Sequence, residues 1–144
     1  MRISSKGRLA LIALCEMALS DDNKLITLSA LSQKLNCSKL YLEQVFAVLR
    51  RSELVLANKG AGGGYFLARK AEEISMYDIL APLELSLFAP SEHTGDASVA
   101  HIENSLHELV FTPLDQSLAH LLSSISLANL AEKTREQQSD MYYI

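Results

Sequence analysis

The chain has 144 residues, of which 49% are hydrophobic and 21% are charged, so it can form a hydrophobic core and is not intrinsically disordered. Its net charge of −4 is unevenly distributed: residues 1–70 carry eleven Lys and Arg against five Asp and Glu, and residues 71–144 carry two against twelve. We interpret the first half as the part that meets a polyanion such as DNA, although chance clustering on a solvated surface gives the same pattern.

Several other classes of protein are excluded. The sequence contains no run of about 20 apolar residues, the length that a membrane-spanning helix needs. The apolar run after the basic N-terminus is interrupted by Glu16, which is not expected in a signal peptide. The two cysteines, Cys15 and Cys37, lack the spacing of a disulfide framework or a zinc site. We therefore expect a cytoplasmic protein whose cysteines are reduced and serve as small packed residues. For Cys37, which lies near Lys34 and Lys39 in the sequence, sensing of oxidants is the alternative.

Two helices are predicted before residue 36. Residues 5–19 and 28–35 both place apolar side chains at helical spacing, and Thr27 is the predicted N-cap of the second helix. The residues expected to face inward are Leu9, Ile12, Ala13, Met17, Leu28, Leu31 and Leu35.

A third helix is predicted over residues 39–52, with Ser38 as its N-cap and Asn36 in a left-handed turn before it. Its apolar residues recur at i, i+3, i+4 and i+7, which indicates one buried face. That face consists of Leu42, Val45, Phe46 and Leu49, and the opposite face of Lys39, Tyr41, Glu43, Gln44, Ala47, Arg50 and Arg51.

A β-hairpin is predicted next, because the strand-like residues 54–57 and 65–68 flank a turn that holds four of the six glycines. A short helix over residues 75–85 contains Pro82, which should kink or shorten it. Residues 89–98 read as an exposed loop.

Long helical patterns fill residues 99–133. Thr112 and Pro113 either begin a new helix or kink a single long one, and Ser126 is predicted to cap a last helix that ends near residue 133. The expected division is a DNA-binding domain over residues 1–85, a loop and candidate effector region over 86–98, dimerisation helices over 99–133, and a flexible tail over 134–144.

Three helices followed by a two-stranded hairpin form the order of a winged helix-turn-helix, whose third helix enters the major groove of DNA. The predicted fold is therefore mainly α with a small hairpin. Gln44 can pair with adenine, Glu43 can accept a hydrogen bond from cytosine, and Lys59 at the hairpin tip can reach the minor groove or a phosphate. The predicted DNA-binding residues are Arg2, Lys6, Arg8, Ser38, Lys39, Tyr41, Glu43, Gln44, Arg50, Arg51, Lys59 and Gly60.

A leucine stripe in the second half predicts a dimer interface, because a palindromic site is read by two copies related by two-fold symmetry. The alternative is that this stripe belongs to an internal core. The predicted interface consists of Leu106, Leu109, Val110, Leu114, Leu118, Leu121 and Leu122.

Four segments resemble one family of regulators. Residues 1–8 are similar to the opening of the family, Tyr41-Leu42-Glu43-Gln44 with Leu49-Arg50 to its recognition helix, residues 59–65 to its wing, and residues 74–80 to the helix that follows. The chain thus resembles the Rrf2 family of winged helix-turn-helix transcription regulators (IscR, NsrR and CymR type). The resemblance is specific over residues 1–85 and looser to about residue 133. It implies a homodimer on an imperfect palindrome, with Lys59 where many members have Arg.

The resemblance also bears on cofactors. Members that bind an iron–sulfur cluster carry three cysteines before the dimer helix, whereas residues 86–110 here contain none. His93, His101 and His107 are present, but histidines without thiolates are poor cluster ligands and are usually ordinary surface residues. We therefore expect no cofactor and no metal, as in the cluster-free CymR-type repressors of cysteine metabolism. The sequence contains no paired carboxylates and no nucleophile at a meaningful spacing from a base, so it does not predict an enzyme.

The C-terminal residues Met141-Tyr142-Tyr143-Ile144 are similar to the ending of CymR-type members, which act with cysteine synthase. A terminal carboxylate on an apolar residue can enter a substrate-anion site, so Tyr142, Tyr143 and Ile144 are predicted to bind that enzyme. A tail packed on its own dimer is the alternative. Two functions result: a DNA-binding repressor of cysteine or sulfur metabolism, or a winged-helix interaction module that binds cysteine synthase.

Overall fold

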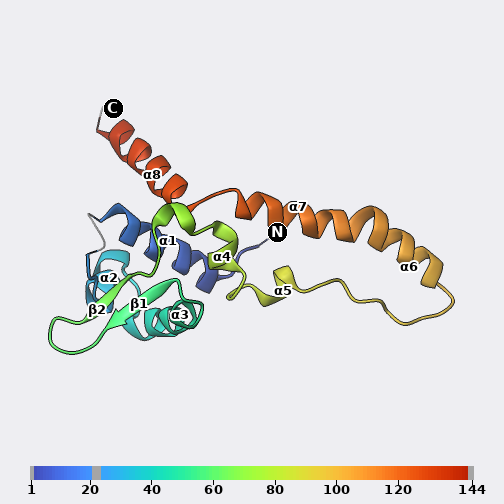
Figure 1. Ribbon diagram of the computed structural model, residues 1–144, viewed down its shortest axis with the longest axis horizontal. Coiled ribbons are helices and arrows are strands. Elements are labelled where there is room, and N and C mark those ends of the chain that lie inside the picture. Colours follow the sequence, from blue (N-terminus) through green and yellow to red (C-terminus); the bar gives the residue numbers. More distant parts are fainter. Residues whose placement is uncertain (1, 21–23, 143–144) are drawn as a thin grey trace.

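The first helix, α1 (Ser5–Leu19), begins at Ser4, whose hydroxyl accepts a hydrogen bond from the Gly7 N–H. The computed structural model describes residues 2–20 and 24–142, and Figure 1 shows a head built around α1, with a long helical arm extending to one side. In α1 the predicted stripe is largely buried, but Ile12 is 45% exposed and does not face inward. The buried side of the helix is instead centred on Ala10, Ala13 and Leu14.

The next two helices, α2 (Leu28–Leu35) and α3 (Lys39–Arg51), begin and end as predicted to within one residue. Thr27 and Ser38 act as their N-caps, and Asn36 between them has φ 50° and ψ 51°. All four residues of the predicted buried face of α3 are fully buried: Leu42, Val45, Phe46 and Leu49. The helix-turn-helix is therefore held by one continuous core with α1.

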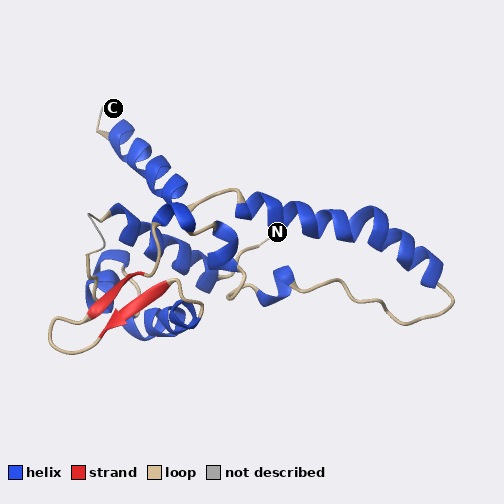
Figure 2. Cartoon of the chain, viewed as in Figure 1, coloured by secondary structure: helices blue, strands red, loops and turns tan. Residues whose placement is uncertain are grey.

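The predicted hairpin is present, shifted by one residue, as strands β1 (Val55–Asn58) and β2 (Gly64–Leu67), which pair antiparallel. Figure 2 shows the two strands beside the helices of the head. Ile26 adds a single residue on the other side of β2, because its N–H and carbonyl exchange hydrogen bonds of 2.9 and 2.8 Å with Tyr65. This contact ties the segment before α2 to the hairpin.

The predicted helix over residues 75–85 is divided in two. After a short 3-10 turn, η1 (Ala71–Glu73), α4 (Met76–Leu80) starts with a capping box between Ser75 and Asp78. It ends just before Pro82, whose ring cannot continue a helix. A new turn, α5 (Leu85–Phe88), then leads to the loop over residues 89–98, which is exposed throughout.

The arm is one continuous helix made of α6 (Ala100–Leu106), η2 (His107–Phe111) and α7 (Thr112–Ser123). Thr112 is helical, with φ −62° and ψ −48°, so the long-helix alternative holds and Thr112 does not cap a new helix. The segment η2 is a π-helical turn in which the Thr112 N–H donates to the His107 carbonyl. This wider turn directly precedes Pro113, which cannot donate a backbone hydrogen bond.

The last helix, α8 (Leu127–Met141), starts at a capping box between Ser126 and Asn129. It continues to Met141, so residues 134–141, which the sequence predicted as a flexible tail, are helical. The polar residues after Lys133 include Arg, Glu and Gln, which are strong helix formers. Arg135 also donates to the Ala18 carbonyl at 3.3 Å, which fastens this part of α8 to α1.

The two cysteines lie on the head. Cys15 is buried in the core, as predicted, and its Sγ lies 3.5 Å from Thr134 Oγ1 on α8. Cys37 is half-buried and packs against the core. Among the residues that the structure describes, no helix is both long enough and apolar enough to cross a membrane.

Candidate nucleic-acid interface

The exposed face of α3 carries side chains suited to reading DNA bases. Glu43 and Gln44 are exposed, Lys39 and Ser38 stand exposed at the helix start, and Tyr41 is half-buried at the edge of this face. A helix that presents polar side chains from its N-terminal turns is the usual reader of the major groove.

The sequence reasoning missed Leu40, which is 65% exposed. It lies three and four residues before Glu43 and Gln44, on the same side of α3. The same spacing continues to Ala47 and Arg51, both exposed. This i, i+3, i+4 pattern was readable from the sequence and indicates an apolar contact on the base-reading face, such as a thymine methyl group.

The hairpin is fixed rigidly against α3. The ring of Tyr65 on β2 meets Phe46 of α3 edge-on, with centroids 4.9 Å apart and an interplanar angle of 63°. Because Phe46 is itself fully buried, its contact with Tyr65 holds the hairpin in place relative to α3. Figure 1 shows both elements along the same edge of the head.

The hairpin tip is an exposed glycine-rich loop with one cation. Lys59 and Gly60 are both exposed. Gly60 has φ 102°, a value that favours glycine, and its carbonyl accepts a hydrogen bond of 2.9 Å from the Gly63 N–H. Nothing lies within 4 Å of the position that a Cβ on Gly60 would take, so the tip is an open, smooth backbone that can approach a groove wall closely.

The remaining predicted cations form two groups. Arg2, Lys6 and Arg8 are exposed at the end of α1 nearest the arm, and Arg50 and Arg51 are exposed at the end of α3. Ion pairs of the head within residues 2–20 and 24–142 involve Lys34 with Glu16 and Arg69 with Asp78.

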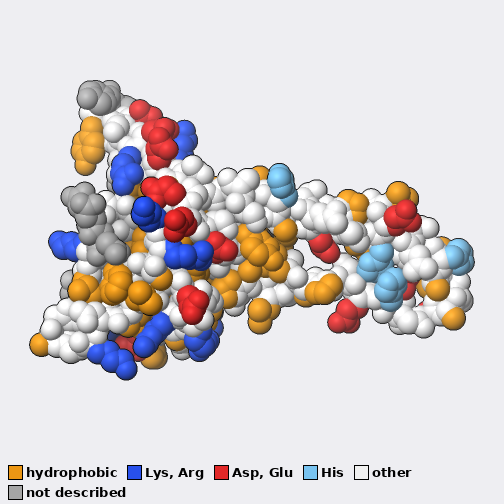
Figure 3. Space-filling view, in the orientation of Figure 1, with side chains coloured by type: hydrophobic (Ala, Val, Ile, Leu, Met, Phe, Trp, Pro, Cys, Tyr) orange, Lys and Arg blue, Asp and Glu red, His pale blue; other side chains and the backbone are white. Residues whose placement is uncertain are grey.

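Charge separates the head from the arm. Figure 3 shows Lys and Arg gathered on the head, while the arm displays Asp, Glu and His. Residues 86–123 contain five Asp and Glu and no Lys or Arg. A polyanion is therefore attracted to the head and repelled by the arm.

The arm carries an apolar surface that the chain itself does not cover. Leu109 is 75% exposed, Leu114 59% and Leu121 56%, while Leu118 and Leu122 are half-buried near the head. Ile102, 52% exposed, extends the surface to the start of the arm. The structure thus brings the predicted interface residues onto one exposed helix, and the alternative of an internal core fails for its outer part.

The loop over residues 89–98 is fastened to α6 through Glu103. The Thr94 N–H donates to both carboxylate oxygens at 3.1 Å, and these hydrogen bonds lower the pKa of Glu103. His93 Nδ1 lies 3.6 Å from the same carboxylate, and its ring stacks on His107 with centroids 4.1 Å apart.

At the C-terminal end of α8, Met141 is 76% exposed and Tyr142 89% exposed. The other two residues of the predicted partner-binding tail, Tyr143 and Ile144, lie outside the described residues.

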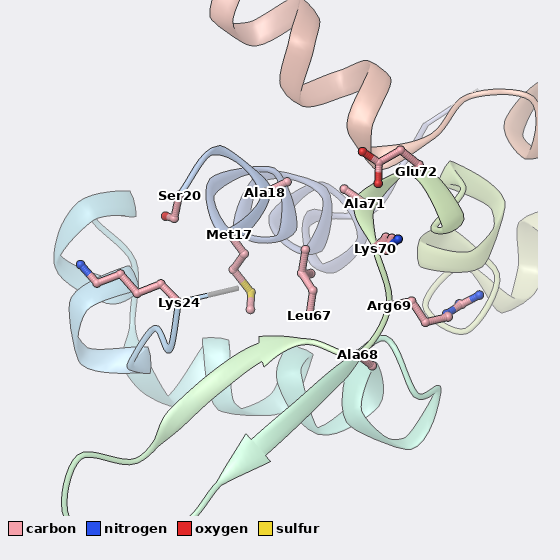
Figure 4. Close-up of a pocket in the computed structure, with 10 residues that line it drawn as sticks. All are labelled: Met17, Ala18, Ser20, Lys24, Leu67, Ala68, Arg69, Lys70, Ala71 and Glu72. Carbon is pink, nitrogen blue, oxygen red and sulfur yellow. The ribbon is translucent and has the colours of Figure 1, made fainter. Parts of the chain in front are cut away.

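An open pocket of ≈ 500 Å³ lies between the end of α1, the end of β2 and η1. Its floor includes Met17 and Leu67, and Figure 4 shows Lys24 and Arg69 on opposite sides with their charged ends apart.

Comparison with known proteins gives a consistent result. Residues 3–133 match the model of the Rrf2 family, described as an iron-dependent transcriptional regulator. The chain is 36% identical over 135 residues to the HTH-type transcriptional regulator IscR of Cereibacter sphaeroides, covering 92% of this chain and 86% of that protein.

Two solved structures have the same fold. CymR, the global cysteine regulator of B. subtilis, has a TM-score of 0.74 at 30% identity, covering 92% of this chain and 98% of that chain. The IscR of T. potens has a TM-score of 0.72 at 30% identity, covering 96% and 91%.

The residues present do not fit the iron that the family description implies. Residues 86–110 contain no cysteine, and within the described ranges no group of three or more His, Cys, Asp or Glu is placed to hold a metal. His93 lies beside both Glu103 and His107. The two imidazole rings are stacked with an interplanar angle of 25°, so their in-plane lone pairs do not point to a common centre.

Proposed function

This chain belongs to the Rrf2 family of transcriptional regulators and is a DNA-binding regulator, not an enzyme; from that premise we propose that it binds a palindromic operator as a homodimer. The observation that carries the proposal is the exposed face of α3, held by the core on one side and by the hairpin on the other. Glu43 and Gln44 supply base contacts, and Lys39, Lys59 and the cations of α1 and the α3 end supply phosphate contacts.

The apolar surface of the arm supports the proposed homodimer. Contiguous apolar surface on a solvent-facing helix marks an interaction site, and the arm presents Leu106, Leu109, Val110, Leu114 and Leu121 exposed by 41% to 75%. A second copy offers the same apolar strip, so a two-fold pairing of arms covers both strips at once. Pairing the arms also gives the two copies of α3 a fixed separation, which palindromic recognition requires.

We further propose that the operator controls cysteine or sulfur metabolism and that binding represses transcription. Support comes from the likeness to CymR, which its structural description calls the global cysteine regulator of B. subtilis. The absence of cysteine from residues 86–110 separates this chain from regulators that sense through a thiolate-bound cluster. A dimer seated on a promoter represses by occupying the site that polymerase needs.

The DNA-binding proposal is tested by selecting bound duplexes from a random pool and titrating the selected site at several salt concentrations. The variant Lys39→Ala/Gln44→Ala/Lys59→Ala should bind at least about tenfold more weakly, and its salt slope should fall by about two because two phosphate contacts are lost. The control, Lys133→Ala, removes an exposed cation from α8 and should bind like the wild type. Equal binding by both variants would rule out the assigned face.

The second candidate function is binding of cysteine synthase through the C-terminus. The observation that favours it is the projection of Met141 and Tyr142, which α8 carries with 76% and 89% exposure. We propose that Tyr142, Tyr143 and Ile144 enter the active-site cleft of the enzyme. Deletion of Ile144 should abolish capture of purified cysteine synthase and leave operator binding unchanged. Capture that is equal with and without Ile144 would end this proposal.

A further inference from the structure

A buried carboxylate joins the start of α1 to the base of the arm. Glu84 is only 7% exposed and lies between α4 and α5. Its Oε1 accepts two hydrogen bonds from Ser4, one from the backbone N–H at 2.8 Å and one from the hydroxyl at 2.6 Å. These two residues are 80 positions apart, so the contact joins two segments that are distant in the sequence.

The first turn of α1 is shaped to receive this carboxylate. A Cβ on Gly7 would collide with Glu84 Oε1 and would also press on Ile3. Gly7 is helical and has an ordinary negative φ, so the carboxylate and not the backbone conformation requires a glycine here. Ser4 performs two tasks at once, because its hydroxyl donates to Glu84 and accepts from the Gly7 N–H at 3.1 Å.

The backbone of Glu84 joins α4 to α5. Its N–H donates to the Leu80 carbonyl at 2.8 Å, which closes α4, and its own carbonyl accepts from the Leu87 N–H at 3.0 Å, which opens α5. On α5, Phe88 meets Tyr77 of α4 edge-on at 5.1 Å. The same two aromatic residues line a small cavity with Asp115 and Leu118 of α7, so α5 lies at the point where the arm meets the head.

We propose that Glu84 is a positioning residue for DNA binding, which sets the angle between the head and the arm and holds the cations of α1 in place. This inference rests on the proposed dimer, because the angle of each arm determines the separation of the two α3 helices on one duplex. Arg2, Lys6 and Arg8 flank Ser4 and Gly7 on both sides, so the same contact locates the phosphate-binding end of α1.

A merely stabilising role would not need this arrangement. The Ser4 hydroxyl alone caps α1, as Thr27 and Ser38 alone cap α2 and α3. Burying a carboxylate is costly unless it is fully hydrogen-bonded, and a carboxylate at a helix N-terminus is favourable for orientation as well as for charge. The cost of burying the Glu84 carboxylate is explained if its contact with Ser4 fixes the angle between the head and the arm.

The angle is measured directly with two spin labels in one chain, at Ala61→Cys on the hairpin tip and Gln116→Cys on the arm, in a Cys37→Ser background. Labelled chains are diluted into unlabelled wild-type protein so that only the intramolecular distance is seen, whatever the oligomeric state. Wild-type protein should give one narrow distance distribution. Glu84→Ala should broaden the distribution and move its mean.

Two further variants separate positioning from stability. Glu84→Gln keeps one acceptor oxygen for both Ser4 hydrogen bonds and should restore most of the narrow distribution. Thr27→Ala removes the N-cap hydrogen bond of α2, 3.1 Å long, and should lower stability comparably while leaving the distribution unchanged. If Glu84→Ala leaves the distribution narrow, or if Thr27→Ala broadens it equally, Glu84 does not position the arm.

A DNA readout completes the test. On selected operators whose half-sites are moved apart or together by one base pair, Glu84→Ala should lose about fivefold or more of the wild-type preference for one spacing. A structural defect lowers the active fraction but leaves the ratio of affinities between spacings unchanged. Failure of the wild type to bind any duplex would refute the proposed function, while the distance measurement would still decide the role of Glu84 at the junction.

Discussion

The apolar side chains of the head are largely buried, whereas those of the arm are largely exposed. In the head, Leu14, Leu42 and Phe46 are fully buried by other residues of the same chain. On the arm, Leu109 and Leu114 are 75% and 59% exposed although they recur with similar helical spacing. The comparison teaches that an apolar stripe predicts burial but does not say what buries it. In the head the covering surface comes from the same chain, whereas on the arm it is the second copy that we propose.

The sharpest way to break this comparison is to charge the arm. We expect Leu109→Glu/Leu114→Glu to convert the dimer to a monomer, because carboxylates in a buried apolar interface are strongly unfavourable. Affinity for a palindromic site should fall by about 10³-fold, approaching non-specific binding, as measured by analytical ultracentrifugation and by DNA titration. The control Asn104→Glu/Thr112→Glu adds the same charge at exposed positions on the opposite side of the arm helix, and a similar loss there would argue against a specific interface.

The complementary change is made in the head. Phe46→Ala should lower the free energy of unfolding by about 3–5 kcal/mol, because it removes a fully buried ring from α3 and its edge contact with Tyr65. Leu114→Ala, studied at a dilution where the dimer has dissociated, should change it by less than about 0.5 kcal/mol. Chemical denaturation followed by circular dichroism compares the two. Equal losses would mean that the arm has a core of its own.

A substitution at the contact between Gly7 and Glu84 should change the free energy of unfolding by less, and the sign of this change is informative. Helix propensity alone predicts that Gly7→Ala stabilises the protein by about 1 kcal/mol. Because the new Cβ would displace the Glu84 carboxylate, we expect instead a loss of about 1–3 kcal/mol. Ser5→Ala in the same turn, where the side chain is exposed, serves as the control in thermal unfolding. If Gly7→Ala stabilised the protein, the Glu84 carboxylate could move aside for the new Cβ without loss of stability.

The smallest expected effect lies in the link between α3 and the hairpin. Glu53 is a non-glycine residue with φ 57°, a left-handed conformation that strains a side chain with a Cβ. Glu53→Gly should therefore raise the free energy of unfolding by about 0.5–1 kcal/mol. The same substitution at the exposed helical Glu132 should lower it by a similar amount. A loss at both positions would mean that the strain at Glu53 is already relieved.

What the sequence determined by itself was local. Helical spacing located α1, α2 and α3, the short polar side chains of Thr27 and Ser38 marked where helices begin, and the glycines located the hairpin turn. These features depend on residues within about four positions of each other, where helix geometry and capping operate. The same locality made the exposed face of α3 readable from the spacing of Glu43 and Gln44, and it would have revealed Leu40 as well.

What only the tertiary structure decided depends on residues far apart in the chain. The pairing of Ile26 with Tyr65 and the contact of Ser4 with Glu84 leave no periodic signal in the sequence, because each joins segments that meet only after the core has formed. The length of α8 was misjudged for a related reason, since a polar segment looks unstructured until its strong helix formers and its contact with Ala18 are considered together. The helical spacing of the leucines likewise does not identify the surface that packs on the arm, because that depends on which molecules assemble with it.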